Sequence, residues 1–145
     1  MTYEIRSGQQ SDVVACVDIL CTWVNETPWL FDPRTPDEQA LIWREFFRHD
    51  LAWVAESRDR IIGFCSRGDD NINALYVATD WRSRGIGKGL LDMAKADRDF
   101  ITVWAYEENV EALKFYRREG LIKIGREIED GSNLVDIEHR WTKQS

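Results

Sequence analysis

The most informative part of the sequence is residues 76–91, which read YVATDWRSRGIGKGLL. From Gly85 onward, apolar residues recur at helical spacing, so a strand and a short loop are followed by a glycine-rich helix start. The first amides of such a helix lack internal partners and lie at the positive end of its dipole. The basic residues Arg82, Arg84 and Lys88 follow one another here with no acid between them. We interpret this segment as a cradle for a pyrophosphate.

Two common glycine motifs do not describe this segment. It lacks the Gly-Lys-Ser/Thr ending of a P-loop. It also lacks the Gly-x-Gly-x-x-Gly spacing of dinucleotide-binding folds, and no acid follows about 20 positions later at a strand end. Because glycines at a strand–helix junction also serve tight turns, they do not establish phosphate binding by themselves.

Two motifs together resemble a known family. Arg82-x-x-Gly85-x-Gly87 resembles the Gln/Arg-x-x-Gly-x-Gly/Ala signature of the Gcn5-related N-acetyltransferases, the GNAT superfamily. Downstream, Asn109-x-x-Ala112-x-x-Phe115-Tyr116 resembles the family's second cofactor motif. The resemblance covers residues 60–125 well, and the rest of the chain in outline. It implies that acetyl-CoA is the cofactor, and that it is bound by Leu75, Tyr76, Val77, Arg82, Arg84, Gly85, Ile86, Gly87, Lys88, Asn109 and Tyr116.

Composition restricts the class of protein. The 145 residues carry a net charge of −7 and are 43% hydrophobic, which predicts a single globular domain spanning 1–145. No apolar run approaches the roughly 18–20 residues that span a bilayer, so we expect no membrane association. The acidic balance argues against nucleic acid as a partner. The cysteines are odd in number and the histidines are two, which indicates no metal site and a cytoplasmic location.

Periodicity and capping signals predict the order of the elements. We expect strands at 2–6, 52–57, 60–66, 71–77, 100–105, 121–128 and 134–141, and helices at 11–25, from 35 through 47, from 85 and from 109. Ser11 is the expected N-cap of the first helix, and Thr35-Pro36-Asp37-Glu38 reads as a capping box. This α/β order is that of the acetyltransferase fold. The resemblance therefore implies a single-domain, mixed sheet of about seven strands, flanked by four helices and splayed between strands 4 and 5.

The loop between the first two helices combines prolines, aromatic residues and acids without any period. It is either pinned to the core by its own aromatic side chains or forms a wall of a substrate site. In the acetyltransferase fold this segment borders the acceptor. We therefore expect Glu26, Trp29, Phe31 and Asp70 to contact the acceptor. The loop from Trp23 to Asp32, together with Asp69, Asp70, Asp136 and Glu138, would form an acidic and aromatic wall that attracts a cation.

The resemblance assigns a chemical role to Tyr116, the general acid that protonates the leaving thiolate. A phenol with a pKa of about 10 suits that role. The general base stays open. Asn71 stands where some relatives have a glutamate, and an amide cannot accept a proton. Two alternatives remain: one of four acids acts through a water (Asp69, Asp70, Asp136 or Glu138), or the amine loses its proton without any single residue as the base.

These features predict an acyltransferase that moves an acetyl group from acetyl-CoA to a small cationic amine, by direct attack in a ternary complex. Several alternatives remain open at this point. They are a non-catalytic acyl-CoA-binding or regulatory module, and an acetyltransferase for protein N-termini or lysines. A phosphate-binding protein that uses the glycine loop alone would leave Asn109 and Tyr116 unexplained. Assembly as a homodimer is also open.

Overall fold

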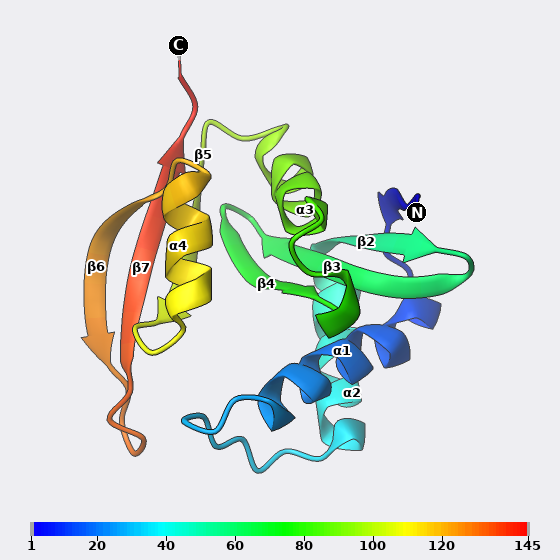
Figure 1. The fold of residues 1–145 in the computed structure, drawn as a ribbon, viewed down its shortest axis with the longest axis horizontal. Helices are drawn as coiled ribbons and strands as arrows, with labels where there is room; N and C mark the ends of the chain where they lie inside the picture. Colours follow the sequence, from blue (N-terminus) through cyan, green and yellow to red (C-terminus); the bar gives the residue numbers. More distant parts are fainter. Residues whose placement is uncertain (1, 145) are drawn as a thin grey trace.

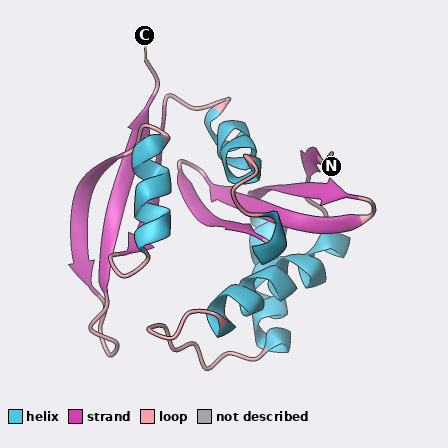
Figure 2. Cartoon of the chain, in the orientation of Figure 1, coloured by secondary structure: helices cyan, strands magenta, loops and turns pink. Residues whose placement is uncertain are grey.

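A seven-stranded mixed sheet runs through the protein in the order β1-β2-β3-β4-β5-β7-β6 (Figure 1). The computed structural model describes residues 2–144. Its strands are β1 (Glu4–Ser7), β2 (Leu51–Ser57), β3 (Arg60–Gly68), β4 (Asn71–Val77), β5 (Phe100–Tyr106), β6 (Ile122–Ile128) and β7 (Val135–Thr142). Its helices are α1 (Val13–Asn25), α2 (Pro36–His49), α3 (Ile86–Lys95) and α4 (Val110–Arg118). The predicted order of strands and helices is confirmed (Figure 2).

Helices cover both faces of the sheet, as the alternation of β3 shows. A side chain added at Gly63 would meet Leu90 and Ile86 of α3 at 3.2 and 3.3 Å. The next residue, Phe64, packs its ring 5.9 Å from that of Trp43 in α2. Successive residues of a strand point to opposite faces, so α3 lies on one face and the α1–α2 pair on the other.

The sheet opens between β4 and β5. These parallel neighbours pair only at Asn71–Thr102 and Ile72–Val103. Beyond that point β4 continues to pair with β3 as far as Val77, and β5 continues to pair with β7 as far as Tyr106. The second halves of β4 and β5 therefore diverge, and each has an edge that is not used by the other (Figure 1). The predicted splay between strands 4 and 5 is confirmed.

Local signals fixed one helix start and misplaced another. The predicted capping box of α2 is present, because the Glu38 amide donates to Thr35 Oγ1 over 3.1 Å. The prediction for Ser11 is wrong, since residues 10–12 form a short 3-10 turn before α1 begins. Asp12 accepts from the Gln9 amide over 2.8 Å and is held by two hydrogen bonds from Arg6. A serine hydroxyl cannot form that ion pair, so the carboxylate anchors this turn.

The capping box leads to a prediction about stability. Thr35→Ala removes the hydroxyl that satisfies the Glu38 amide and should lower the free energy of unfolding by about 1 kcal/mol. Thr22→Ala is the matched control, because its exposed hydroxyl only donates back to the Asp18 carbonyl within α1. Such a mid-helix bond contributes little. Urea denaturation measures both variants, and equal losses would contradict the capping role.

Candidate active site

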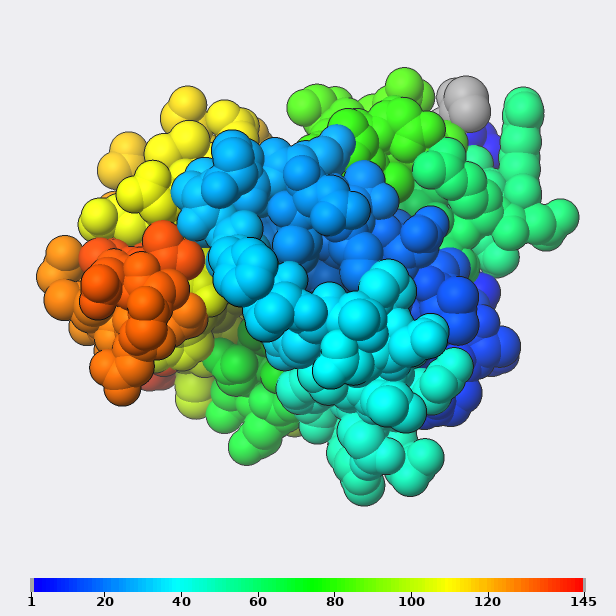
Figure 3. Space-filling view, turned by 90° about the horizontal axis from the view of Figure 1, so that it is seen from below, coloured from blue at the N-terminus to red at the C-terminus, as the bar shows by residue number. Residues whose placement is uncertain are grey.

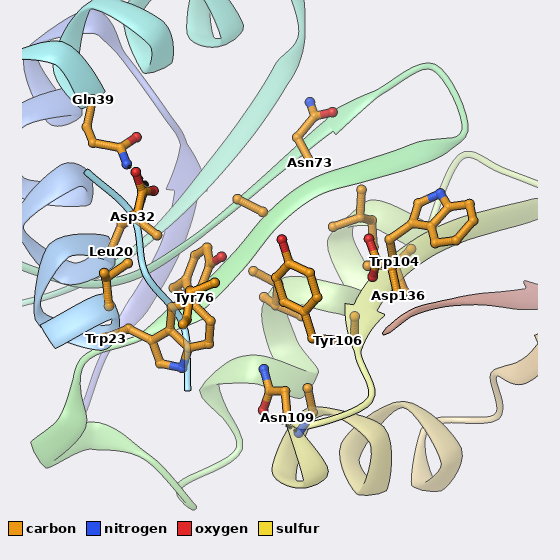
Figure 4. A pocket seen from close by; sticks show the side chains of 18 of the residues that line it. Leu20, Trp23, Asp32, Gln39, Asn73, Tyr76, Trp104, Tyr106, Asn109 and Asp136 are labelled. Atoms are coloured by element: carbon orange, nitrogen blue, oxygen red, sulfur yellow. Dashed lines mark hydrogen bonds between the residues drawn. The ribbon is translucent and has the colours of Figure 1, made fainter. Parts of the chain in front are cut away.

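A cavity of about 650 Å³ lies where β4 and β5 diverge (Figure 4). Its floor includes Ala74–Tyr76 of β4 and Val103–Tyr106 of β5. Helices α1, α2 and α4 contribute walls, as do the α1–α2 loop and the β6–β7 turn. Seen from below, that loop in light blue lies beside the turn in orange (Figure 3). The opening of the sheet is thus lined by segments from both halves of the chain.

The start of α3 has the features of an anion cradle. Gly85 caps the helix with a left-handed backbone (φ +83°), a conformation that favours glycine. The first amide bonded into the helix is that of Gly89, which donates to the Gly85 carbonyl over 3.0 Å. The amides of Ile86, Gly87 and Lys88 have no acceptor within residues 2–144. These donors are therefore available to a ligand.

The glycines of α3 serve different purposes. A Cβ at Gly87 would make only ordinary contacts, at 3.5 Å from Phe115 and 3.9 Å from Val77. Packing therefore does not require a glycine there. A Cβ at Gly89 would lie only 2.9 Å from Ile5 Cδ1, so this glycine accommodates β1. Packing against β1 explains Gly89 but not Gly85 or Gly87, so the cradle interpretation depends on these two glycines.

Two of the three basic residues of the cradle have acidic neighbours. Arg82 donates to the Val77 carbonyl over 3.2 Å and faces Glu26 at 3.6 Å. Lys88 pairs with Asp92 at 3.2 Å and with Glu119 at 3.4 Å. The third, Arg84, lies over the Trp81 ring at 5.1 Å. Because these charges are partly compensated, the free amides are the more selective part of the cradle.

The second predicted motif joins the cavity from α4. The Asn109 side-chain oxygen accepts from the Ala112 amide over 3.2 Å, and the residue also lines the cavity. Tyr116 lines it as well and is 6% exposed. Its hydroxyl makes no hydrogen bond with residues 2–144. Burial raises the pKa of Tyr116, so the phenol keeps its proton at neutral pH.

On the side facing α1 and α2, four aromatic rings form a continuous arc. Tyr76 of β4 lies 5.3 Å from Trp23, and Trp23 lies 6.2 Å from Trp29. Trp29 in turn lies 5.8 Å from Tyr106 of β5. We call these four residues the aromatic arc. It links the two diverging strands through the α1–α2 loop, and the labelled members in Figure 4 border the cavity.

The structure separates the four residues expected to contact the acceptor. Phe31 lines the cavity and is 85% exposed. Trp29 supports Trp23 and Tyr106 from outside the cavity lining. Glu26 lies beside the cradle, where it accepts from Thr79 Oγ1 over 2.9 Å. Asp70 also lies outside the cavity lining and faces Arg98 at 3.6 Å.

Three carboxylates line the cavity: Asp32 and Asp136, which both belong to the expected acidic wall, and Glu129, which no sequence pattern indicated. Asp32 is held by Arg34 at 2.7 Å and by Gln39 at 3.0 Å, and the hydrogen bond from Arg34 lowers the pKa of Asp32. Glu129 accepts from the Tyr106 hydroxyl over 2.7 Å. Residues that lie far apart in sequence therefore create an acidic lining without any local motif.

The cavity offers no cysteine nucleophile among the described residues. Cys16 and Cys65 are buried in the core, and Cys21 is half-buried. None of them lines the cavity. Burial raises the pKa of Cys65 to about 12, which leaves it almost entirely as the unreactive thiol. Residues 2–144 also contain no cluster of three or more acidic, histidine or cysteine side chains that could hold a metal ion.

Comparison with known proteins identifies the family of this chain and agrees with its fold. Residues 48–120 match the model of the acetyltransferase (GNAT) domain. The chain belongs to the GNAT family of N-acetyltransferases, enzymes whose acetyl donor is acetyl-CoA. No helix within residues 2–144 is both long enough and apolar enough to cross a membrane.

Two curated relatives match nearly the whole chain. The peptidyl-lysine N-acetyltransferase YjaB of Escherichia coli (strain K12) is 28% identical over 132 residues, which cover 90% of each chain. YiaC of the same organism, also a peptidyl-lysine N-acetyltransferase, is 26% identical over 146 residues, or 94% of this chain and 95% of its own. The solution structure of YjaB from Escherichia coli superposes with a TM-score of 0.79 over 97% of this chain and 98% of that one, at 26% identity.

A second solved structure resembles this one in fold. The protein yncA from Salmonella typhimurium, solved with its cofactor acetyl-CoA, has a TM-score of 0.75 and 16% identity, covering 98% of this chain and 94% of its own. In this chain, the residues present fit such a cofactor. The cradle offers unpaired amides for phosphate oxygens, and β4 offers an edge that β5 leaves free.

Proposed function

We propose that this enzyme acetylates the ε-amino group of lysine in a protein or peptide, by direct attack in a ternary complex. One observation carries the proposal. A single cavity joins the free edge of β4 and the Tyr116 hydroxyl to an aromatic and acidic lining. The β4 edge and the Tyr116 hydroxyl suit a thioester cofactor. The aromatic and acidic lining suits a cation on an aliphatic stem.

The cofactor side of the cavity offers groups that would bind the cofactor, stabilise the charge on the thioester oxygen and protonate the leaving sulfur. The main chain of Leu75, Tyr76 and Val77 would pair with the extended arm of the cofactor, and residues 82–88 would hold its phosphates, with Asn109 beside the arm. When bound, acetyl-CoA supplies the thioester carbonyl that an amine attacks. An N–H group of β4 would donate to the carbonyl oxygen as charge develops there. The Tyr116 hydroxyl holds the proton that the leaving sulfur requires.

The acceptor side favours a lysine side chain. Its stem would lie against the aromatic arc, and its ammonium group would reach the carboxylates. The relatives that match nearly the whole chain are named for peptidyl-lysine, and this moves our proposal from a free small amine to a lysine within a peptide. Phe31, which is 85% exposed at the cavity, offers a surface for the residues flanking that lysine.

The absence of a cysteine from the cavity lining supports direct attack. A covalent acetyl-enzyme needs a nucleophile within reach of the thioester. The three cysteines lie elsewhere, and two of them are buried. The amine itself is therefore the nucleophile in our proposal.

Acceptor preference can be measured directly. We expect kcat/KM to be higher for a peptide with one lysine and a blocked N-terminus than for butylamine or glutamate. The difference from glutamate should be at least about tenfold. Exposed charges are screened by salt, so the advantage over glutamate should shrink as ionic strength rises above about 0.15 M. The same peptide with its lysine already acetylated is the control. Equal kcat/KM for the lysine peptide and glutamate would refute the acceptor assignment.

A further inference from the structure

We infer that Asp136 binds the acceptor ammonium group and takes its proton. This inference rests on the proposed function, since it assigns a residue to the amine in the same cavity. It answers a question that the sequence leaves open, namely which residue, if any, acts as the base.

The position of Asp136 follows from the pairing of β7. Ile137 and His139 are buried, and His139 lies 5.5 Å from the ring of Tyr116 in α4. Asp136 alternates with them and therefore faces the other side of the sheet. Its cross-strand partners are Tyr106 of β5 and Glu127 of β6. Figure 4 shows Asp136 beside Trp104 and Tyr106 at the cavity.

Asp136 differs from the other two carboxylates of the cavity in having neither a cation nor a side-chain hydrogen bond within residues 2–144. Asp32 is satisfied by Arg34 and Gln39. Glu129 accepts hydrogen bonds from the hydroxyl groups of Tyr106 and Ser132, at 2.7 and 2.8 Å. The carboxylate of Asp136 has neither an ion pair nor a side-chain hydrogen bond within residues 2–144. An ammonium group is stabilised most by a carboxylate that is half-buried and has no other cation beside it.

The groups around Asp136 also favour its protonated form. Burial is the largest cause that raises the pKa of Asp136, followed by the negative charge of Glu129 and, more weakly, that of Glu127. The Ile137 main-chain N–H opposes this shift. The remaining titratable neighbour, Tyr106, has its own pKa raised by burial and by its hydrogen bond to Glu129, so it stays neutral. Asp136 is therefore a stronger proton acceptor than an ordinary aspartate.

The proton transfer is balanced. One N–H bond of the ammonium group breaks, its electron pair remains on nitrogen as a lone pair, and an O–H bond forms on the Asp136 carboxylate. The amine is then a neutral nucleophile. After the product leaves, the Asp136 carboxyl releases this proton to solvent and returns to its ionised form.

The competing acids are placed differently. Asp69 and Asp70 face Arg98 at 3.8 and 3.6 Å, and Glu138 does not line the cavity. Asn71 is also occupied, because its side-chain oxygen accepts from Thr102 Oγ1 over 3.0 Å. Of the four acids left open by the sequence, only Asp136 lines the cavity.

The first test is a pH profile with a matched control. Asp136→Asn should lower kcat/KM for the lysine peptide at pH 7 by at least about 100-fold, the low end of general-base losses. The deficit should narrow as pH rises toward about 10.4, the pKa of free lysine, because neutral amine then forms without a base. Glu138→Gln, on the same face of β7, should stay within about twofold of the wild type. A deficit that does not change with pH would overturn the role.

A second test uses the wild type without acetyl-CoA. Carbon NMR of the Asp136 carboxyl, assigned by its loss in Asp136→Asn, should give a pKa above that of ordinary aspartate. Adding butylammonium should lower this pKa, because the cation stabilises the carboxylate. No response to butylammonium would overturn the inference. If the cation lowers the pKa but the lysine peptide is not acetylated, the proposed function fails while cation binding at Asp136 stands.

The melting temperature of Asp136→Asn gives a further check, because the raised pKa predicts the direction in which it changes with pH. Because folding raises the pKa of Asp136, the ionised residue destabilises the native state at pH values above that pKa. Asp136→Asn should therefore melt no lower than the wild type at pH 7, and any gain should vanish as pH falls below the unfolded-state value. A lower melting temperature at pH 7 would show that the carboxylate has a structural role instead.

Discussion

Replacing Gly87 with glutamate is expected to lower the affinity for acetyl-CoA by at least about 100-fold, or about 2.7 kcal/mol, without unfolding the protein. The amides of Ile86 to Lys88 have no acceptor within residues 2–144. A glutamate side chain would cover them and place a negative charge where phosphate oxygens bind. Titration calorimetry measures the affinity, and circular dichroism confirms the fold.

Gly87→Ala is the matched control for this prediction. Its Cβ meets Phe115 at 3.5 Å and Val77 at 3.9 Å, which are ordinary contacts, so the alanine variant should fold and retain affinity within about tenfold. Wild-type affinity in a folded Gly87→Glu variant would contradict the cradle assignment. Equal losses in both variants would show that the shape of the loop, and not free access to its amides, determines binding.

Tyr116→Phe is expected to lower kcat by about 10²–10⁴-fold and to leave the Kd for acetyl-CoA within about threefold. The substitution removes one hydroxyl from a side chain that is 6% exposed and whose hydroxyl has no partner within residues 2–144. The raised pKa of Tyr116 means that the phenol is protonated throughout the pH range of an assay. Single-turnover measurements report the chemical step directly.

Tyr76→Phe controls for the loss of a hydroxyl from the same cavity. Tyr76 also lines it, and burial raises the pKa of Tyr76 to about 12. We expect this variant to keep kcat within about threefold. A larger loss in Tyr76→Phe than in Tyr116→Phe would assign the proton donor to β4 and contradict the role of Tyr116.

Features encoded locally were predicted well from the sequence. The strand Asn71–Val77 begins and ends where alternation placed it, and Asn109 caps α4 through its own side chain. The Thr35 capping box depends on residues only three positions apart. Such signals require no knowledge of distant parts of the chain, and they determine the order and bounds of most elements.

The acceptor side could not be predicted, because its charges are paired by tertiary contacts. Glu26 meets Thr79 and Arg82 across more than 50 residues of sequence, and Asp70 meets Arg98. No local pattern shows that these acids have partners while Asp136 has no cation. Alternation along residues 135–141 does place Asp136 and the buried His139 on different faces of the sheet. It does not reveal which face holds the cavity.

Aromatic contacts connect the two diverging halves of the sheet across the cavity. The aromatic arc joins Tyr76 of β4 to Tyr106 of β5 through Trp23 and Trp29. Tyr106 then contacts Glu129, beside Asp136 on the β6–β7 side. In our account, Asp136 of β7 holds the amine nitrogen, β4 holds the acetyl donor, and the aromatic arc holds the lysine stem.

The most direct test of acetyl transfer to lysine follows the acetyl group itself. The enzyme is incubated with acetyl-CoA labelled in its acetyl carbons and with a blocked peptide that contains one lysine, and mass spectrometry then locates the label. Our account predicts that label appears on the lysine ε-nitrogen, and that none is found on the enzyme when the peptide is withheld. Label held on a side chain of the enzyme, or none on the peptide while acetyl-CoA binds, would contradict it.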